Sequence, residues 1–228
     1  MSDLRRVVIW GASGHASVVA DIIRAEGQYQ VAGLLDDVDP YRQVAFGRVL
    51  GGRDQLPKVR ASGVQHLVIG IGDNTVRREL AAYAQELGFE LVSVVHPRAT
   101  LAAGVVLGAG TVVMAGAVIN PGTRVGRNVI VNTCASVDHD CVLGDAVHVC
   151  PGTHLAGNVA IGNGTFIGIG SVVRDRVRIG AECVVGAGSV VIEDLGDRVL
   201  AYGSPARVVQ PARLNADRTT ISGGNQTV

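Results

Sequence analysis

The chain has 228 residues, of which 47% are hydrophobic and 18% are charged, and its 20 basic and 20 acidic side chains leave no net charge. This composition excludes intrinsic disorder, and the neutral balance gives no field that would attract nucleic acid or an anionic membrane. No apolar run approaches the roughly 18 residues of a transmembrane helix, and the four cysteines form no CxxC pair, so we expect a cytoplasmic protein.

The first hundred residues alternate between short apolar strands and helices. Strands are predicted over residues 6–10, 31–35, 66–71 and 91–95, with one helix ending near Arg24 and another over 75–87. This alternation favours a small parallel sheet of the Rossmann-like α/β class. Pro97 interrupts the chain soon afterwards, so we place a domain boundary near residue 98 and assign residues 1–98 to the first domain.

A glycine-containing loop joins the first strand to the first helix. The backbone amides of Gly11-Ala12-Ser13-Gly14 can face a phosphate at the helix N-terminus. The full GxGxxG fingerprint is absent, so a tight strand–helix turn is the structural alternative. Asp36 comes directly after the second strand, near the position where an acidic residue often binds a ribose hydroxyl. This end of the sheet is therefore a candidate nucleotide site.

A six-residue period dominates the second half of the chain. From Leu101 to Val191, every sixth residue is Leu, Ile or Val, at sixteen positions without a gap. A small or β-branched residue follows four positions after the anchors. A period of six fits neither a helix nor an alternating strand, and it predicts a hexapeptide β-helix of roughly five coils. We assign residues 99–209 to this domain, including a C-terminal cap, and expect a flexible tail over 210–228.

Several segments together carry a family resemblance: GASGH after the first strand, LDD at the second, GIGDN at the third, VDHDCVLGDAVHV within the hexads, and a final YGSPAR. They resemble the bacterial sugar acyltransferases with a left-handed β-helix, which include nucleotide-amino-sugar N-acetyltransferases of bacillosamine and perosamine synthesis and relatives described as sialic acid O-acetyltransferases. The resemblance implies left-handed coils, a homotrimer, and acetyl-CoA bound between neighbouring β-helices. It also implies acetylation of the amino group of a nucleotide-linked amino-sugar held by the N-terminal domain.

The resemblance also implies binding residues. The positions expected to contact the nucleotide-sugar, or to form the rim of its site, are Ser13, Gly14, His15, Asp36, Asp37 and Gly72, and the positions expected to contact acetyl-CoA are His148, Ile169 and Ala187. His15 has an alternative interpretation as a cap of the first helix.

His139 is the candidate general base. It occupies the third position of its hexad, outside the two internal positions, and an imidazole with a pKa near about 6.5 suits proton removal from an attacking amine. Asp140 matches an acidic family position, commonly glutamate, that orients the imidazole. Gly157 comes three hexads after His139, one coil further on. Its amide can donate to the oxyanion of a tetrahedral intermediate, and a plain corner glycine is the alternative.

Other functions were weighed against this one. The γ-class carbonic anhydrases also form β-helix trimers and bind zinc through histidines. However, His148 and His154 take the same position in consecutive hexads, so they project from different faces and cannot share a metal within one chain, which leaves only a site between subunits as the alternative. We therefore expect no metal. A sugar O-acetyltransferase and a non-catalytic nucleotide-sugar-binding protein remain as further alternatives, and the sequence leaves the nucleotide and the sugar open.

Overall fold

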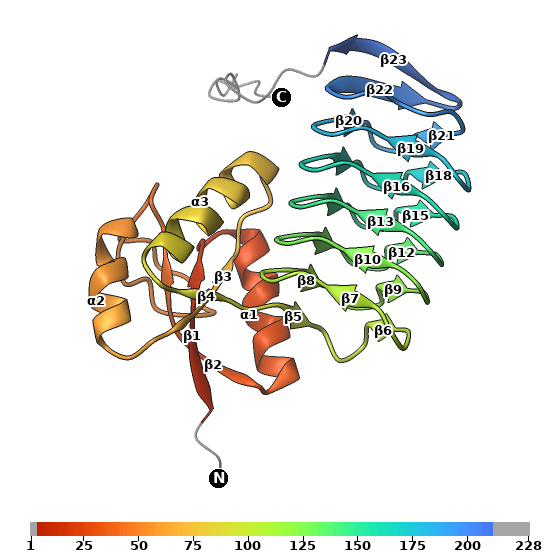
Figure 1. The fold of residues 1–228 in the computed structure, drawn as a ribbon. Coiled ribbons are helices and arrows are strands. Elements are labelled where there is room, and N and C mark those ends of the chain that lie inside the picture. The colour runs from red at the N-terminus through yellow and green to blue at the C-terminus, as the bar shows by residue number, and fades with distance from the viewer. Residues whose placement is uncertain (1–3, 212–228) are drawn as a thin grey trace, which may run out of the picture.

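The computed structural model describes residues 4–211, which form an N-terminal α/β domain beside a tall parallel β-helix (Figure 1). The tail predicted over 210–228 lies outside the described residues from position 212 onward. No helix in the described part of the chain is long and apolar enough to cross a bilayer.

A parallel sheet of four strands, in the order β2-β1-β3-β4, forms the N-terminal domain. Its strands are β1 (Arg5–Trp10), β2 (Tyr29–Leu35), β3 (His66–Ile69) and β4 (Glu90–Leu91), and its helices are α1 (Gly14–Glu26), α2 (Leu56–Ala61) and α3 (Asn74–Glu86), with a 3₁₀ turn over Arg53–Gln55. Alternate residues of β1 point to opposite faces. Val7 and Ile9 pack on the side of α1, whereas Val8 and Trp10 pack on the side of α2 and α3. The predicted Rossmann-like α/β class is confirmed.

The strand predicted over residues 91–95 is wrong as a single element. Residues 90–91 form β4, whereas Val94–Val95 form β5, which pairs with a strand of the β-helix. Apolar residues stand on both sides of Ser93 in this stretch, so periodicity alone could not show where the chain leaves one sheet for the other. The first strand of the β-helix thus precedes the boundary predicted near residue 98.

Three faces of two-residue strands form the β-helix. The first face holds β5 (Val94–Val95), β8 (Val112–Val113), β11 (Ile130–Val131), β14 (His148–Val149), β17 (Phe166–Ile167) and β20 (Val184–Val185). The second face holds β6 (Thr100–Leu101), β9 (Val118–Ile119), β12 (Ser136–Val137), β15 (His154–Leu155), β18 (Val172–Val173) and β21 (Val190–Val191). The third face holds β7 (Val106–Leu107), β10 (Arg124–Val125), β13 (Val142–Leu143), β16 (Ala160–Ile161) and β19 (Arg178–Ile179).

The coils number about six, one more than predicted, because β5 opens a coil before the first anchor of the hexad run. Each strand pairs in register with the strand three hexads along the chain, as His148 does with Ile130. The antiparallel pair β22 (Val199–Gly203) and β23 (Ala206–Pro211) covers the last coil, where the sequence predicted a cap.

The two internal positions of each hexad fill the β-helix as predicted. Every anchor from Val113 to Val191 is buried. The hydroxyls at the small position lie inside without an energetic penalty because they hydrogen-bond to backbone. Thr123 Oγ1, for example, donates to the Asp138 carbonyl at 2.8 Å and accepts from the Cys141 amide at 3.2 Å.

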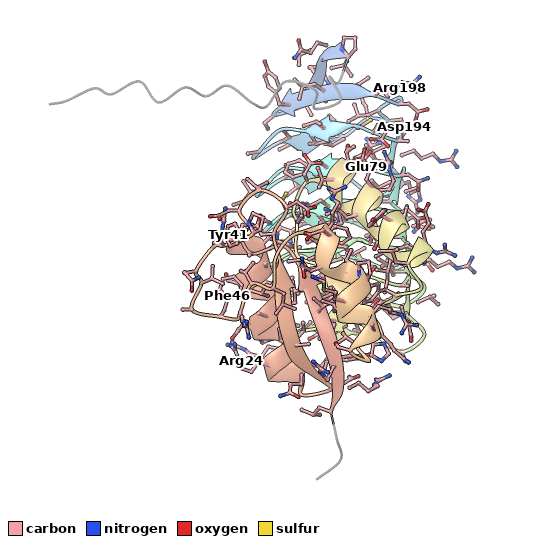
Figure 2. The ribbon with its side chains drawn as sticks, turned by 90° about the vertical axis from the view of Figure 1, so that its left-hand side faces the viewer. Arg24, Tyr41, Phe46, Glu79, Asp194 and Arg198 are labelled. Carbon is pink, nitrogen blue, oxygen red and sulfur yellow. The ribbon has the colours of Figure 1, made fainter. Side chains whose placement is uncertain are left out.

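The N-terminal domain covers the first face of the lower coils. Helix α1 packs against β5, and the outward side chains of Val112 and Ile130 join its hydrophobic core. Helix α3 lies along the edge between the third and first faces. Viewed from the side of this domain, the coils around Asp194 and Arg198 rise above it (Figure 2). The edge between the second and third faces lies opposite the first face and is therefore free of the N-terminal domain of the same chain.

Candidate active site

His139 lies at the corner between β12 and β13, on the edge between the second and third faces. Its Nδ1 is 2.9 Å from Asp140 Oδ2, so the contact expected from the motif is present despite the shorter aspartate side chain. The His139 amide donates to Asp138 Oδ1, which also accepts from Asn120 Nδ2 one coil below, both at 2.8 Å. The ring is thereby oriented while 54% of the side chain stays exposed.

Acidic neighbours favour the protonated form of this imidazole. The hydrogen bond to the Asp140 carboxylate raises the pKa of His139 above the ordinary value of 6.5, and the charges of Asp138 and Asp140 act in the same direction. In turn, hydrogen bonds from Asn120 and the His139 amide lower the pKa of Asp138. The Nε2 atom has no hydrogen-bond partner in the described part of the chain, so it is available to a substrate.

Gly157 lies against the His139 ring, one coil above it. A Cβ at this position would stand 2.6 Å from His139 Nε2 and 2.7 Å from Cε1. Only glycine therefore lets the ring take this place against the backbone. The position one coil beyond His139 is the one predicted from the hexad spacing.

The Gly157 amide has no acceptor among the described residues, and the same holds for the Asp175 amide one coil further on. On the edge between the third and first faces, the amides of Arg127 and Asp145 each donate to a side-chain oxygen one coil above, at 2.7 and 2.8 Å. Asp175 stands one coil above Gly157, but it pairs with Arg176 at 3.0 Å instead. A free amide beside an oriented imidazole can stabilise a developing oxyanion.

The start of α1 forms an open glycine loop. Ser13 is the N-cap residue, yet its side chain makes no capping hydrogen bond, and both Ser13 and Gly14 are exposed. Gly11 has φ +133°, and a Cβ there would lie 2.6 Å from the Gly70 carbonyl oxygen, so the tight turn requires glycine. A Cβ at Gly14 would meet nothing within 4 Å. The α1 N-terminus is thus open to a ligand, and the binding of a phosphate there stays a prediction.

Asp36 and Asp37 make internal contacts that the sequence did not indicate. Asp36 Oδ1 accepts from the amides of Val38 and Asp39, and its Oδ2 lies 3.3 Å from Arg42 Nε. Asp37 accepts from the backbone and guanidinium of Arg53 and, at 3.3 Å, from Trp10 Nε1. Both carboxylates thus fix the loop after β2, and their contact with a nucleotide-sugar stays a prediction.

A cavity of about 860 Å³ lies on the outer side of this loop. Its lining comprises Pro40, Tyr41, Arg42, Gln43, Ala45, the segment 47–52, Asp54 and Gln55.

His15, Gly72 and His148 come together between the two domains. His148 projects from β14, with its Nδ1 3.2 Å from the Gly72 carbonyl oxygen and its Nε2 3.0 Å from Asn132 Nδ2. The Asn132 Oδ1 accepts from the Thr133 amide, so Nδ2 is the donor to His148. His148 therefore carries its proton on Nδ1 and donates it to Gly72.

The two histidines of this cluster are neutral. Burial, followed by the charge of Arg77, lowers the pKa of His148 to about 3 and that of His15 to about 4. Their ring centroids are 6.4 Å apart, and His15 Nε2 is buried without a hydrogen-bond partner among the described residues. Because both ring nitrogens of His148 are engaged, this side chain is poorly suited to be a base, and its contact with acetyl-CoA stays a prediction.

The predicted site residues thus form separate groups within one chain. Ile169 and Ala187 lie one coil apart on the edge between the first and second faces, where both are exposed. His139 and Gly157 lie on the edge between the second and third faces. The cluster of His15, Gly72 and His148 lies on the first face, across the β-helix from His139.

Comparisons with known proteins agree with this architecture. Residues 6–84 match the family described as PglD N-terminal domain, and residues 158–193 match that described as bacterial transferase hexapeptide (six repeats). UDP-N-acetylbacillosamine N-acetyltransferase of Bacillus subtilis (strain 168) is 35% identical over 122 residues, which cover 49% of this chain and 52% of that protein. The aligned stretches span about half the length of the curated sugar N-acetyltransferases.

Solved structures align over far more of the chain. A variant of perosamine N-acetyltransferase from Caulobacter crescentus, in complex with CoA and GDP-perosamine, is 44% identical, with a TM-score of 0.88 and coverage of 91% of this chain and 98% of that one. The chain belongs to the nucleotide-amino-sugar N-acetyltransferases. The acetyltransferase domain of PglB from Neisseria gonorrhoeae FA1090, in complex with acetyl coenzyme A, is 37% identical, with a TM-score of 0.85 and coverage of 91% and 100%. These matches confirm the predicted left-handed β-helix.

The sequence reasoning missed several residues of this N-acetyltransferase. Arg77 is buried at the domain interface, and Asn132 fixes the orientation of His148. A signal for Arg77 was present, because it lies on the same face of α3 as Leu80, Ala81 and Ala84, which are all buried. A charged residue at a core-facing helical position is rare unless it is paired.

The two histidines considered as zinc ligands lie on different faces of the β-helix, as the sequence predicted. His148 lies on the first face and His154 on the second. Within residues 4–211, no group of three or more His, Cys, Asp or Glu side chains is arranged to hold a metal ion.

Proposed function

We propose that the protein transfers an acetyl group from acetyl-CoA to the exocyclic amine of a nucleotide-linked amino-sugar. The observation that carries this proposal is the His139–Asp140 pair held against Gly157, whose amide has no acceptor within residues 4–211. Support comes from the 44% identical Caulobacter crescentus relative, which was solved with CoA and GDP-perosamine. An amine, a thioester and one oriented base are sufficient for direct acyl transfer.

In the proposed reaction, the amine nitrogen attacks the thioester carbonyl carbon while His139 Nε2 removes its proton. Asp140 stabilises the resulting imidazolium through Nδ1. The tetrahedral oxyanion accepts a hydrogen bond from the Gly157 amide. When the carbon–sulfur bond breaks, the imidazolium returns the proton to the CoA thiolate, leaving an amide on the sugar and a neutral His139.

The separation of the site residues supports a homotrimer whose active sites lie between subunits. A nucleotide-sugar at Gly14 and Gly72 lies on the first-face side, whereas His139 of the same chain lies on the opposite edge. A second copy can bring its His139 to that sugar, and a closed ring of three copies makes all three sites equivalent. Exposed valines on the outer faces, such as Val142 and Val172, give the copies apolar surface to bury.

The test is a panel of GDP-, UDP- and dTDP-linked amino-sugars, each assayed for free thiol release from acetyl-CoA. We expect turnover with one nucleotide class, an N-acetyl product by mass spectrometry, and a fall of about 10² to 10⁴ in His139→Ala. Turnover only with sugars that lack an amine would indicate an O-acetyltransferase instead. Sugar binding without thiol release from any donor–acceptor pair would indicate a binding protein.

A further inference from the structure

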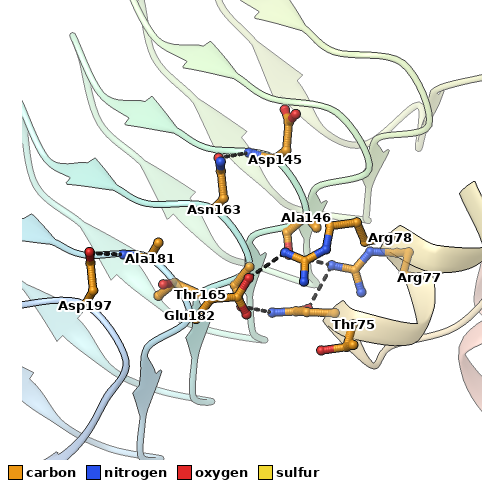
Figure 3. A network of polar contacts seen from close by, with 12 residues as sticks. Thr75, Arg77, Arg78, Asp145, Ala146, Asn163, Thr165, Ala181, Glu182 and Asp197 are labelled. Carbon is orange, nitrogen blue, oxygen red and sulfur yellow. Dashed lines mark hydrogen bonds and ion pairs between the residues drawn. The ribbon is translucent and has the colours of Figure 1, made fainter. Parts of the chain in front are cut away.

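Helix α3 is hydrogen-bonded to a ladder of β-helix corners at residues 128, 146, 164 and 182, which are spaced one coil apart. Figure 3 shows Arg77 and Arg78 of this helix beside the corners at Ala146 and Glu182. Asn74 Nδ2 donates to the Gly164 carbonyl at 2.9 Å, and Arg78 forms an ion pair with Glu182. Arg77 donates to the carbonyls at the two remaining corners, Asn128 at 2.8 Å and Ala146 at 2.9 Å.

Arg77 uses its whole guanidinium in this interface. It is 1% exposed, and besides the two corners it donates to Asn74 Oδ1 at 2.8 Å and, through NH1, to the carbonyls of Ile71 at 3.3 Å and Gly72 at 2.9 Å. These contacts occupy the five N–H donors that an arginine has. All five acceptors are neutral amide oxygens, and a buried charge of this kind is tolerated only when it is fully hydrogen-bonded.

The contact with Gly72 connects Arg77 to the predicted rim of the sugar site, called the substrate rim below. The Gly72 carbonyl accepts from Arg77 NH1 and faces His148 Nδ1 at 3.2 Å, so donors from both domains hold it. A lysine in place of Arg77 has three donors on one flexible nitrogen and cannot reproduce this fork. The position of the rim relative to the β-helix is therefore set by the planar geometry of Arg77.

We propose that Arg77 is a positioning residue for the acceptor sugar: by binding Gly72, Asn128 and Ala146 at once, it fixes the substrate rim of the N-terminal domain at one height along the β-helix. This proposal rests on the proposed function, because the rim matters to turnover only if it presents the amine. Arg77 acts through Gly72 and does not touch the reacting atoms. Its loss should misplace the sugar while leaving the acetyl-CoA site intact.

The test compares Arg77→Lys with Arg78→Met as a matched control. Arg78 is the next residue of α3 and also bonds to the ladder, but it has no contact with the rim. For Arg77→Lys we expect kcat/KM for the amino-sugar to fall by about 10- to 100-fold, since small misplacements have effects of this size, with KM for acetyl-CoA within twofold of the wild type. For Arg78→Met we expect kcat/KM for the amino-sugar to stay within twofold, even if the unfolding midpoint falls.

A second variant decides the question if Arg77→Lys does not fold. Arg77→Gln removes the buried charge and keeps one amide nitrogen with two donors, so it cannot reach Gly72 and both corners at once, and we expect it too to lower kcat/KM for the sugar selectively. Wild-type sugar kinetics in whichever of these two variants folds would overturn the proposal. If the wild type acetylates no amino-sugar, that result contradicts the proposed function and not the role of Arg77. The role of Arg77 is then tested by the calorimetric affinity of Arg77→Lys for the nucleotide-sugar. An affinity equal to that of the wild type would overturn the proposal.

Discussion

At the scale of single residues, the proposed mechanism predicts that the His139–Asp140 contact sets the pH at which the enzyme works. The base must be neutral to accept a proton, and the Asp140 carboxylate raises the pKa of His139 above its ordinary value of 6.5. Activity should therefore be lost as pH falls through a point above that value. In Asp140→Asn this acidic limb should move to lower pH, because the neutral amide no longer stabilises the imidazolium. The measurement is kcat against pH for both proteins, and an unmoved limb would show that Asp140 does not tune the base.

Gly157 offers a second test at this scale. Gly157→Ala should leave the fold intact, because the atom that a Cβ would meet at 2.6 Å belongs to the movable His139 ring. The displaced ring should lower kcat by roughly tenfold or more. A Cβ at Gly196 would meet nothing within 4 Å, so Gly196→Ala is the matched control and should have normal turnover. Equal kinetics for the two variants would remove the proposed ring–glycine contact from the mechanism.

Residue-level contacts could be predicted where the residues are adjacent in sequence or lie one coil apart. The hexad spacing placed Gly157 against His139, and adjacency in sequence placed Asp140 beside it. Prediction failed for Arg77, whose five acceptors come from segments brought together only by the fold, with Asn128 and Ala146 lying 51 and 69 residues away. Side-chain partners at such separations depend on how two domains dock, which no period in the sequence encodes.

At the scale of elements, the hexad period determined the β-helix almost completely because every anchor must point inward. The same reasoning could not divide residues 91–95 between two sheets, since both environments are apolar. It also could not show that Asp36 and Asp37 bind their own loop. Short carboxylates after a strand commonly accept hydrogen bonds from nearby backbone amides, and the sequence does not distinguish that role from ligand binding.

The α1 N-terminus gives a prediction at the element scale. Gly14→Val should fold, because a Cβ at Gly14 would meet nothing within 4 Å, whereas Gly11 is confined by the Gly70 carbonyl and is unsuited to such a test. The valine would occupy the space in which a phosphate approaches the helix amides. We expect KM for the nucleotide-sugar to rise about tenfold or more with KM for acetyl-CoA unchanged. Equal loss of both affinities would contradict the assignment of the sugar to this loop.

At the scale of the whole molecule, the opposed positions of His139 and the substrate rim predict complementation between subunits. Neither His139→Ala nor Gly14→Val alone should be active at low sugar concentration. In mixed trimers, a site is intact when a Gly14→Val subunit supplies His139 and a His139→Ala subunit supplies the rim. For random assembly from equal amounts, that combination occurs at about a quarter of the sites.

The experiment is to unfold the two variants together, refold the mixture, and measure thiol release against mass. Light scattering should give about 70 kDa, three times the chain mass of 23.5 kDa, and activity should recover towards a quarter of the wild-type value. Each variant refolded alone is the control, and both should remain inactive. If each site were built from one chain, every site in the mixture would lack either its base or its rim, and no activity would return. Recovery therefore requires that His139 act on a sugar bound by a neighbouring subunit, which is the arrangement that the placement of the two groups on opposite sides of the β-helix predicts.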